Sequence, residues 1–363
     1  MKTIDELPTP AVLIELPVLE ANIARQAERA REASVALRPH AKTHKSPQIA
    51  RMQLEAGARG ISLAKTSEAE VFAREGFDDI FLAYPIVGLG KPARLLALSD
   101  AIRLSVGIDS FEGAEALSAV FARAGRRLDV RLKIDCGYGR VGVKPENAAA
   151  LARRVAELPG VTLTGVFTHG GQAYAAETPA ETAKAARQEG ESVVGAARAL
   201  AAAGLPVETI SVGSTPSARL VMKVPGVTEC RPGNYVFHDG SQVALGTCEA
   251  SDCAMTVLAT VVSVPASDRA VVDAGSKTLS TDPLRPRPGG HGLVLGTASR
   301  IEKLSEEHGV IHVAPGDRFR VGERVRILPN HACVISNLYD RLYGVRAGCV
   351  ETEIVVAARG RVE

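Results

Sequence analysis

The strongest constraint on the fold of this chain is a regular alternation of strand-like and helix-like segments between about residues 22 and 245. Short apolar runs end in polar or glycine-containing loops, and most are followed by an alanine-rich stretch with helical spacing. Eight such strand–helix units predict a (β/α)8 barrel of the TIM type. An open doubly wound sheet is the alternative, and it fits less well because no G-x-G-x-x-G follows the first strand. The predicted barrel strands are residues 35–37, 60–64, 79–84, 102–108, 128–134, 163–167, 209–212 and 227–230.

After about residue 250 the chain becomes rich in strand-like segments separated by Gly/Pro turns, with little helical pattern. We therefore predict an α/β fold in which the barrel, over residues 20–247, is followed by a mostly β domain formed by residues 1–19 and 248–363. The early strand-like segment 11–15 is a candidate to pair with that second domain. The other strands predicted there are 254–264, 270–273, 308–313, 324–328 and 353–358.

Composition excludes several classes of function. The net charge is +2 and the charges are interspersed, so no nucleic-acid partner is expected. No apolar stretch is long enough to span a membrane, and the first residues lack the apolar core of a signal peptide, so we expect a cytoplasmic protein. The cysteines form no C-x-x-C pair, and we expect reduced thiols with one or two available for a metal. They are Cys136, Cys230, Cys248, Cys253, Cys333 and Cys349.

Lys42 is the most informative single residue. It follows the first predicted barrel strand, and a helical stretch begins near Pro47. Surrounding cations disfavour the charge of a lysine, and a lysine with a lowered pKa is what a Schiff base to an aldehyde cofactor requires. Taken alone, the segment fits a solvated basic loop equally well. The neighbouring basic residues are Arg38, His40, His44 and Lys45.

Two glycine-containing loops, 213–215 and 232–234, follow the last two predicted strands. In (β/α)8 barrels these loops commonly hold a phosphate, because backbone N–H groups unobstructed by a Cβ can point at the anion. Each loop alone fits an ordinary turn. A lysine and a phosphate cradle on the same rim together indicate pyridoxal 5′-phosphate (PLP).

These motifs resemble those of the fold-type III PLP enzymes, whose barrel is shared with alanine racemase. The resemblance is closest to the D-threonine aldolase and D-serine dehydratase group, and it runs in family order along nearly the whole chain. The matching segments are 38–44, 168–171, 213–216 and 231–235 in the barrel, and 273–277 and 329–333 in the β domain.

The resemblance implies roles for individual residues. Lys42 would carry the cofactor as a Schiff base and act in catalysis together with His169, which would lie against the cofactor ring. Lys45 ranks second as the anchoring lysine. Arg140 would approach the phenolic oxygen, and Arg231 would contact the pyridine nitrogen if it acts as its racemase counterpart does. Tyr174 also fits a packed core aromatic. The phosphate would be bound by Gly213, Ser214, Gly233 and Asn234, and the other implied cofactor contacts are Gln172, Tyr174, Thr215 and Tyr235.

His331 and Cys333 form a second motif. Residues i and i+2 of an extended strand face the same side, so an imidazole and a thiolate could share one cation there. Two protein ligands leave the metal open to water or substrate, as in catalytic sites. An H-x-C pair alone is more often structural, but a His-x-Cys or His-x-Asp metal pair is characteristic of the family. A sulfur ligand favours Zn, with Mn and Mg as alternatives.

The resemblance implies a PLP- and divalent-metal-dependent lyase acting on β-hydroxy-D-amino acids. D-threonine aldolase is favoured, because segments 334–340 and 357–360 look most like that enzyme. D-serine dehydratase is the alternative, since family aldolases can carry Asp where this chain has Cys333 and dehydratases typically carry Cys. An amino-acid racemase and a non-catalytic PLP carrier fit less well, because neither needs the metal pair. A small amino-acid substrate and a homodimer are expected.

Overall fold

The computed structural model describes residues 2–286 and 289–363, which form two compact units. The barrel unit comprises Gln26–Lys42, Ala50–Gly233 and Arg361–Glu363, and the β unit comprises Met1–Arg25, Thr43–Ile49 and Asn234–Gly360. The domain limits predicted from the sequence stay a prediction, because helices α1 (Leu16–Glu32) and α2 (Pro47–Glu55) each run through both units.

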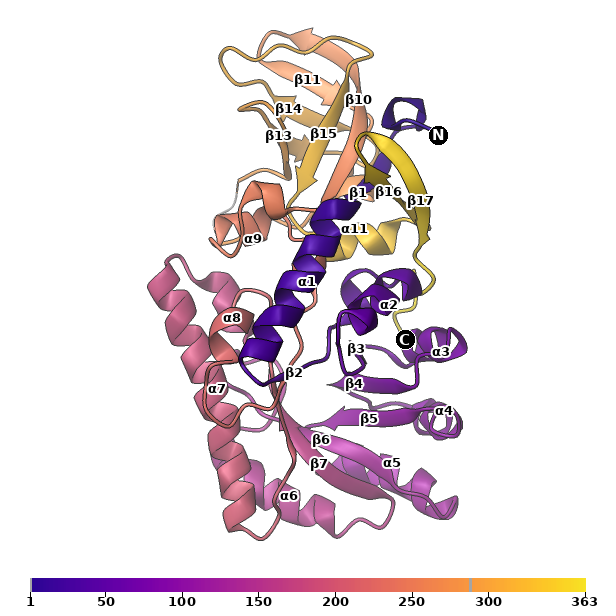
Figure 1. Ribbon diagram of the computed structural model, residues 1–363, viewed down its shortest axis with the longest axis vertical. Helices are drawn as coiled ribbons and strands as arrows, with labels where there is room; N and C mark the ends of the chain where they lie inside the picture. Colours follow the sequence, from indigo (N-terminus) through magenta and orange to yellow (C-terminus); the bar gives the residue numbers. More distant parts are fainter. Residues whose placement is uncertain (1, 287–288) are drawn as a thin grey trace. The chain divides into compact units, whose positions relative to one another are not determined.

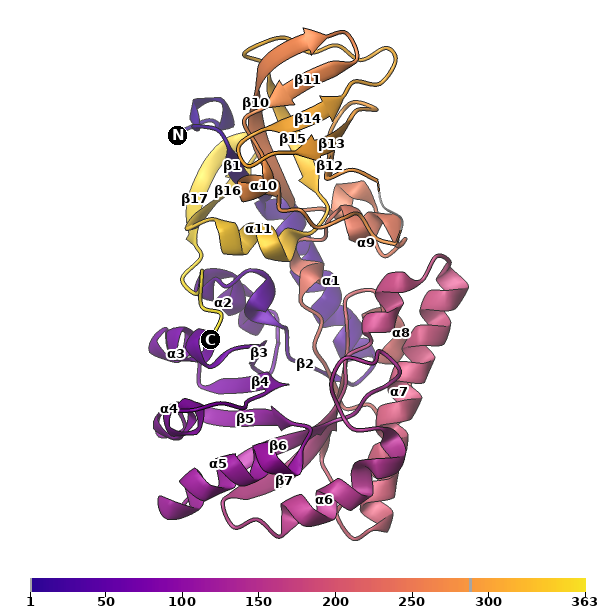
Figure 2. The ribbon, with the colours of Figure 1, turned by 180° about the vertical axis from the view of Figure 1, so that it is seen from behind.

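The barrel unit contains an eight-stranded parallel sheet (Figures 1 and 2). Its strand order is β2-β9-β8-β7-β6-β5-β4-β3, and a parallel bridge between His40 and Ser62 joins the two ends. The predicted barrel is therefore confirmed, and each of the eight predicted runs overlaps one of its strands. The strands are β2 (Ala36–Leu37), β3 (Ile61–Leu63), β4 (Asp79–Pro85), β5 (Arg103–Ile108), β6 (Leu128–Lys133), β7 (Val161–Phe167), β8 (Thr209–Val212) and β9 (Glu229–Cys230).

Helices flank this sheet (Figures 1 and 2), and most of the strand residues are buried. Inside, the rings of Phe81 and Phe167 are fully buried and meet edge to face, with centroids 5.0 Å apart. Burial on both faces explains why these strands read as apolar runs rather than as alternating patterns. The helices are α3 (Thr66–Arg74), α4 (Lys91–Leu98), α5 (Phe111–Arg123), α6 (Ala148–Ala156), α7 (Pro179–Ala202) and α8 (Ala218–Val221).

The β unit is built on a nine-stranded sheet in which every pairing except β1–β16 is antiparallel. Strands β11, β14, β13, β12, β15 and β10 form a closed ring, since β11 also pairs with β10. Strand β1 pairs with both β10 and β16, which confirms the expected pairing of segment 11–15 with this part of the chain. The strands are β1 (Ala11–Glu15), β10 (Met255–Ala266), β11 (Arg269–Val272), β12 (Gly292–Val294), β13 (Arg300–Leu304), β14 (Gly309–His312), β15 (Arg324–Pro329), β16 (Arg341–Arg346) and β17 (Cys349–Val355).

The sequence missed β12, β13 and β16, which are short or carry exposed charged residues and so lack a clear apolar pattern. The predicted last strand, 353–358, was placed too late. Strand β17 begins at Cys349 because it pairs with β16, and the chain turns after Val355. Short helices α9 (Gly240–Ala244), α10 (Ser276–Leu279) and α11 (Ala332–Leu338) complete the unit. Among the described residues, the helices are too short or too polar to cross a bilayer.

Candidate active site

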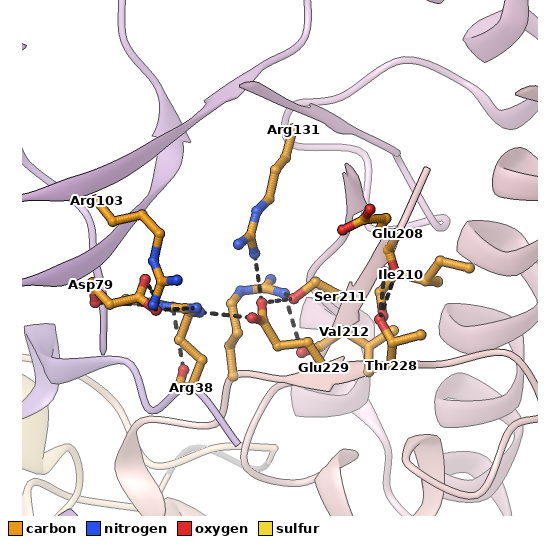
Figure 3. A network of polar contacts seen from close by, with 12 residues as sticks. Arg38, Asp79, Arg103, Arg131, Glu208, Ile210, Ser211, Val212, Thr228 and Glu229 are labelled. Atoms are coloured by element: carbon orange, nitrogen blue, oxygen red, sulfur yellow. Dashed lines mark hydrogen bonds and ion pairs between the residues drawn. The ribbon is translucent and has the colours of Figure 1, made fainter. Parts of the chain in front are cut away.

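A buried network of charges lies inside the barrel unit, between strands β2, β4, β6, β8 and β9 (Figure 3). Glu229 is at its centre: Arg38 Nε donates to Oε2 at 2.7 Å, and Arg131 Nη1 donates to Oε1 at 2.7 Å. Ser211 Oγ also donates to Oε1, at 2.6 Å. Burial alone would raise the pKa of Glu229, but Arg131 and Arg38 hold it down to about 2. The carboxylate therefore stays ionised and fixes both guanidinium groups.

This network changes one expectation about Lys42. Arg38 was predicted to crowd the lysine with positive charge. Its guanidinium instead lies between two carboxylates, because Nη1 also donates to Asp79 Oδ1 at 2.7 Å (Figure 3). With its charge balanced by Asp79 and Glu229, Arg38 is part of the barrel core rather than an uncompensated cation.

Arg231 is held rigidly within the barrel unit. Its guanidinium donates to the carbonyl oxygens of Thr168, at 2.5 Å, and Val212, at 3.3 Å, and to the hydroxyl of Ser211. Burial, as the largest cause, lowers the pKa of Arg231 to about 10, so it remains charged at neutral pH. Its Nε is buried and has no hydrogen-bond partner among the described residues. A fixed buried cation with a spare donor suits an anionic ligand.

Lys42 is exposed and lies in the short helix η2 (Ala41–Thr43), which follows β2. Its charge acts on three neighbouring basic groups of the barrel unit. Burial first, and then Lys42, lowers the pKa of His40 and of His169 well below the usual range. Burial together with Arg231 lowers the pKa of Lys133 to about 7. Both imidazoles are therefore neutral at neutral pH, and Lys133 is divided between its two forms.

One small cleft of the barrel unit brings together Arg140 and His169, two of the predicted cofactor contacts. Both side chains contact the ring of Tyr138. The Arg140 guanidinium carbon lies 5.1 Å from the ring centroid, and the His169 ring meets the tyrosine ring edge to face, with centroids 5.9 Å apart. Lys133, which the sequence reasoning passed over, lines the same cleft. Its signal was available: Arg131 and Lys133 alternate with Val130 and Leu132 on β6, so both basic side chains lie on the same face of the strand.

The loop after β8 turns at Gly213, where a side chain would not fit. Gly213 has φ +121°, and a Cβ there would lie 2.8 Å from the backbone nitrogen of Arg231. The Gly213 N–H donates to Glu189 Oε1 at 2.7 Å, and Ser217 Oγ donates to Oε2 of the same carboxylate at 2.7 Å. Gly213 therefore allows the loop to turn, while its N–H is already hydrogen-bonded to the Glu189 carboxylate. Glu189 has no sequence signal, because it is one of several glutamates on the long helix α7.

The remaining predicted cofactor contacts have varied surroundings. Gln172 Nε2 donates to the Cys136 carbonyl oxygen at 3.3 Å, and Tyr174 is half-buried in the same short helix, η4 (Gly171–Ala175). Asn234 is buried in the β unit, and its Oδ1 has no partner among the described residues. The others are the buried Ser214, Thr215 and Tyr235 and the half-buried Gly233.

His331 and Cys333 lie at the start of helix α11 in the β unit, and not on a strand as predicted. The prediction was wrong because the chain turns into a helix at this point. The N–H of Ala332 donates to Asp239 Oδ2 at 3.0 Å, so a buried carboxylate 93 residues earlier holds the helix start. His331 remains extended before the helix, and Cys333 lies in its first turn.

The pair still interacts. Burial would lower the pKa of His331, but the charge of Cys333 and the nearby carboxylates raise it to about 10. Burial would raise the pKa of Cys333, but His331 lowers it. The thiol lies 3.3 Å from Thr43 Oγ1, and His331 Nδ1 lies 2.6 Å from Asp282 Oδ2. Each side chain thus shifts the pKa of the other toward its charged form.

The donor set fits a divalent metal with two protein ligands. A hydrogen bond from Nδ1 to Asp282 leaves Nε2 of His331 as the ligand atom, the usual arrangement for a metal-bound histidine. Over residues 2–286 and 289–363, no three His, Cys, Asp or Glu side chains group in a way that could hold a metal ion. Water or substrate would have to complete the coordination sphere, as in catalytic sites.

Comparison with known proteins identifies the family. Residues 14–240 match the family model for the alanine racemase N-terminal domain, and residues 254–345 match that for a putative serine dehydratase domain. The chain is 36% identical to D-threonine aldolase of Arthrobacter sp., over 97% of this chain and 93% of that protein. It is 37% identical to D-threo-3-hydroxyaspartate dehydratase of Delftia sp. strain HT23, over 96% of this chain and 97% of that protein.

This chain belongs to the D-threonine aldolase and D-serine dehydratase family of fold-type III PLP enzymes. The resemblance noted from its motifs is thereby confirmed. Solved structures agree on the fold: D-threonine aldolase from Filomicrobium marinum has a TM-score of 0.92 at 32% identity, covering 100% of this chain and 98% of that one. A variant of D-threo-3-hydroxyaspartate dehydratase, solved in a metal-free form, has a TM-score of 0.91 at 36% identity, covering 98% of this chain and 99% of that one.

Proposed function

We propose that this protein is a PLP- and divalent-metal-dependent lyase that acts on β-hydroxy-D-amino acids, and that it is a D-threonine aldolase. The observation that carries the proposal is the presence in one chain of a lysine in the segment that follows barrel strand β2 and a His–Cys pair at the start of α11. Relatives named as a D-threonine aldolase and as dehydratases of D-serine and D-threo-3-hydroxyaspartate support the substrate class.

The residues of the barrel unit would hold PLP. Lys42 would bind its aldehyde carbon, and the loop that begins at Gly213 would receive its phosphate. Arg231 presents a fixed cation toward an anionic ligand, and its charge would leave a pyridine nitrogen beside it unprotonated. Bound PLP supplies an electron sink for the bond broken at the substrate α-carbon.

His331 Nε2 and Cys333 Sγ would hold the metal, with Asp282 orienting the imidazole. A divalent cation held there would supply a Lewis acid toward the β-hydroxyl of the substrate, lowering the pKa of that group. A thiolate ligand favours zinc among the candidates, with manganese or magnesium as alternatives.

Proton transfer falls to basic groups that are neutral at neutral pH. His169 is neutral because burial and Lys42 lower its pKa, so its imidazole can accept a proton. In the aldolase reaction, a base removes the β-hydroxyl proton, the Cα–Cβ bond breaks and the α-carbon gains a proton, so D-threonine yields glycine and acetaldehyde. In the alternative dehydratase reaction, the Lys42 amine removes the α-proton and hydroxide leaves, and water then hydrolyses the dehydrated product, so D-serine yields pyruvate and ammonia.

A product analysis separates these activities. The purified protein, supplied with PLP and a divalent metal, is incubated with D-threonine, D-serine and D-threo-3-hydroxyaspartate, each with and without EDTA. We expect acetaldehyde and glycine from D-threonine, with loss of turnover in EDTA. Ammonia and a keto acid as the main products would replace the aldolase assignment with a dehydratase. Inversion without cleavage would indicate a racemase, absence of turnover would favour a PLP carrier, and turnover unaffected by EDTA would contradict the metal requirement.

A further inference from the structure

A second group of chemically reactive side chains lies in the β unit, apart from the residues assigned above. Cys248 follows helix α9, Cys253 follows the short helix η6 (Ala250–Asp252), and His238 precedes α9. The intervening turn folds the chain back on itself: Cys253 Sγ lies 3.9 Å from the carbonyl oxygen of Glu249, the residue after Cys248. Both cysteines carry free thiols.

Backbone contacts hold the two ends of this segment together. The N–H of Ala254 donates to the carbonyl oxygen of Phe237 at 2.7 Å, which places the residue after Cys253 beside the residue before His238. The buried Asn22 amide donates to the carbonyl oxygens of Val236, at 3.3 Å, and Asp252, at 2.8 Å. The backbone therefore brings the chain around Cys253 next to the chain around His238.

The surroundings make the two thiols unequal. Interaction with the Cys253 thiol, and then with the His238 imidazole, lowers the pKa of Cys248 to about 6 against the effect of burial. Contact with Cys248, and then burial, raises the pKa of Cys253. Cys248 is half-exposed and Cys253 is buried. The arrangement is that of an accessible thiolate with a protonated thiol beside it.

We propose that Cys248 and Cys253 are a modification site that hydroperoxides oxidise reversibly to an intramolecular disulfide. The Cys248 thiolate attacks hydrogen peroxide: an S–O bond forms, the O–O bond breaks, and hydroxide leaves. The Cys253 thiol then attacks the resulting sulfenic acid: an S–S bond forms, the S–O bond breaks, and water leaves with the Cys253 proton. Two electrons pass from the thiols to the peroxide. This proposal does not depend on the proposed lyase activity.

Peptide mapping of the full-length protein tests the proposal. The reduced protein is treated with limiting hydrogen peroxide, blocked with N-ethylmaleimide, and cleaved with trypsin and a glutamate-specific protease. Glu249 lies between the two cysteines, so cleavage yields fragments 230–249 and 250–269. We expect these fragments to remain joined until a thiol reductant is added. Cys230 also lies on the first fragment. Loss of the joined product in the Cys248→Ser variant would show that Cys248, and not Cys230, forms the disulfide with Cys253.

Variants separate the two steps. In Cys253→Ser we expect a sulfenic acid at Cys248 that dimedone captures, because the resolving thiol is missing. Cys349→Ser removes a half-buried thiol elsewhere in the β unit and should leave the joined fragments unchanged. In the wild-type protein, Cys248 should react with N-ethylmaleimide at pH 7 about tenfold faster than Cys349. Equal reactivity of these two thiols, or fragments that separate without reductant after peroxide treatment, would overturn the proposal.

Discussion

The charge network around Glu229 in the barrel unit and the His331–Asp282 pair in the β unit hold their ionised groups in different ways. In the barrel, the side chains of Arg38 and Glu229 are each 3% exposed, and every charge in their network has at least one opposite partner. In the β unit, His331 and Asp282 are 39% and 43% exposed and form a single short contact. Breaking a buried ion pair is costly, because it leaves an uncompensated charge away from water. A half-exposed imidazole, by contrast, can release its proton and bind a metal ion in its place. The barrel network therefore fixes a framework, and the β-unit pair is suited to binding a ligand.

The largest expected effect tests whether the barrel unit carries the covalent chemistry. Replacing Lys42 by Ala removes the amine proposed to bind the cofactor, so turnover should fall by about 10⁴-fold and the yellow absorbance of the bound cofactor should disappear. The measurements are the absorption spectrum of the purified protein and its rate of D-threonine cleavage.

Lys45 is the matched control, because it is three residues away and was the second candidate. Its ammonium donates to Asn337 Oδ1 at 2.9 Å within the β unit. Borohydride reduction followed by peptide mapping should attach the cofactor to Lys42 in the Lys45→Ala variant. Labelling of Lys45 in the wild-type protein, or an unchanged spectrum in Lys42→Ala, would contradict the assignment.

Two substitutions compare how much a buried and an exposed ion pair contribute to the free energy of unfolding. Glu229→Gln leaves Arg38 and Arg131 buried without their shared carboxylate, which should lower the free energy of unfolding by about 3–5 kcal/mol. Glu353→Gln breaks the exposed pair with Arg341, and its effect should stay below about 1 kcal/mol. Urea denaturation followed by circular dichroism is suitable, since the chain has no Trp. Equal effects of the two substitutions would remove the distinction between the units.

The same network predicts a pH dependence. The pKa of Glu229 is lowered in the folded protein from 4.5 to about 2, so the folded state binds this proton less readily than the unfolded state. The stabilisation is therefore complete above pH 4.5 and is lost as the pH falls toward 2. The wild-type protein should lose more stability than Glu229→Gln over this interval, as measured by urea midpoints at successive pH values.

The barrel could be predicted from the sequence because its signals are local. Strands buried on both faces read as apolar runs, and the order of the strands fixes which loops share the rim. That reasoning located Lys42, the 213–215 loop, and the region of Arg140 and His169. It could also have found Lys133, whose place two residues after Arg131 on β6 puts both side chains on the same face of the strand.

The rest depended on contacts between distant residues. His331 and Cys333 were predicted on a strand, but Asp239 binds the N–H between them and starts a helix. The anchoring of Gly213 by Glu189 likewise joins a loop to a helix that begins more than thirty residues earlier. Pairings of this kind follow from the packed structure and leave no local pattern. The assigned roles of the site residues stay predictions.

The smallest expected effect is on metal affinity, and it concerns the contact between His331 and Asp282 in the β unit. Asp282 contacts Nδ1 of His331 at 2.6 Å, so it should keep Nε2 directed at the metal. Asp282→Asn should weaken metal binding about 10- to 100-fold, because a neutral amide orients the imidazole less firmly. Asp268→Asn removes an exposed carboxylate of the same unit and serves as the charge-matched control. Affinity is measured by competition with a chromophoric chelator, without reference to turnover. If both variants bind zinc as tightly as the wild-type protein, Asp282 has no part in orienting His331. If the wild-type protein itself binds no metal, it is the proposed metal site that is wrong.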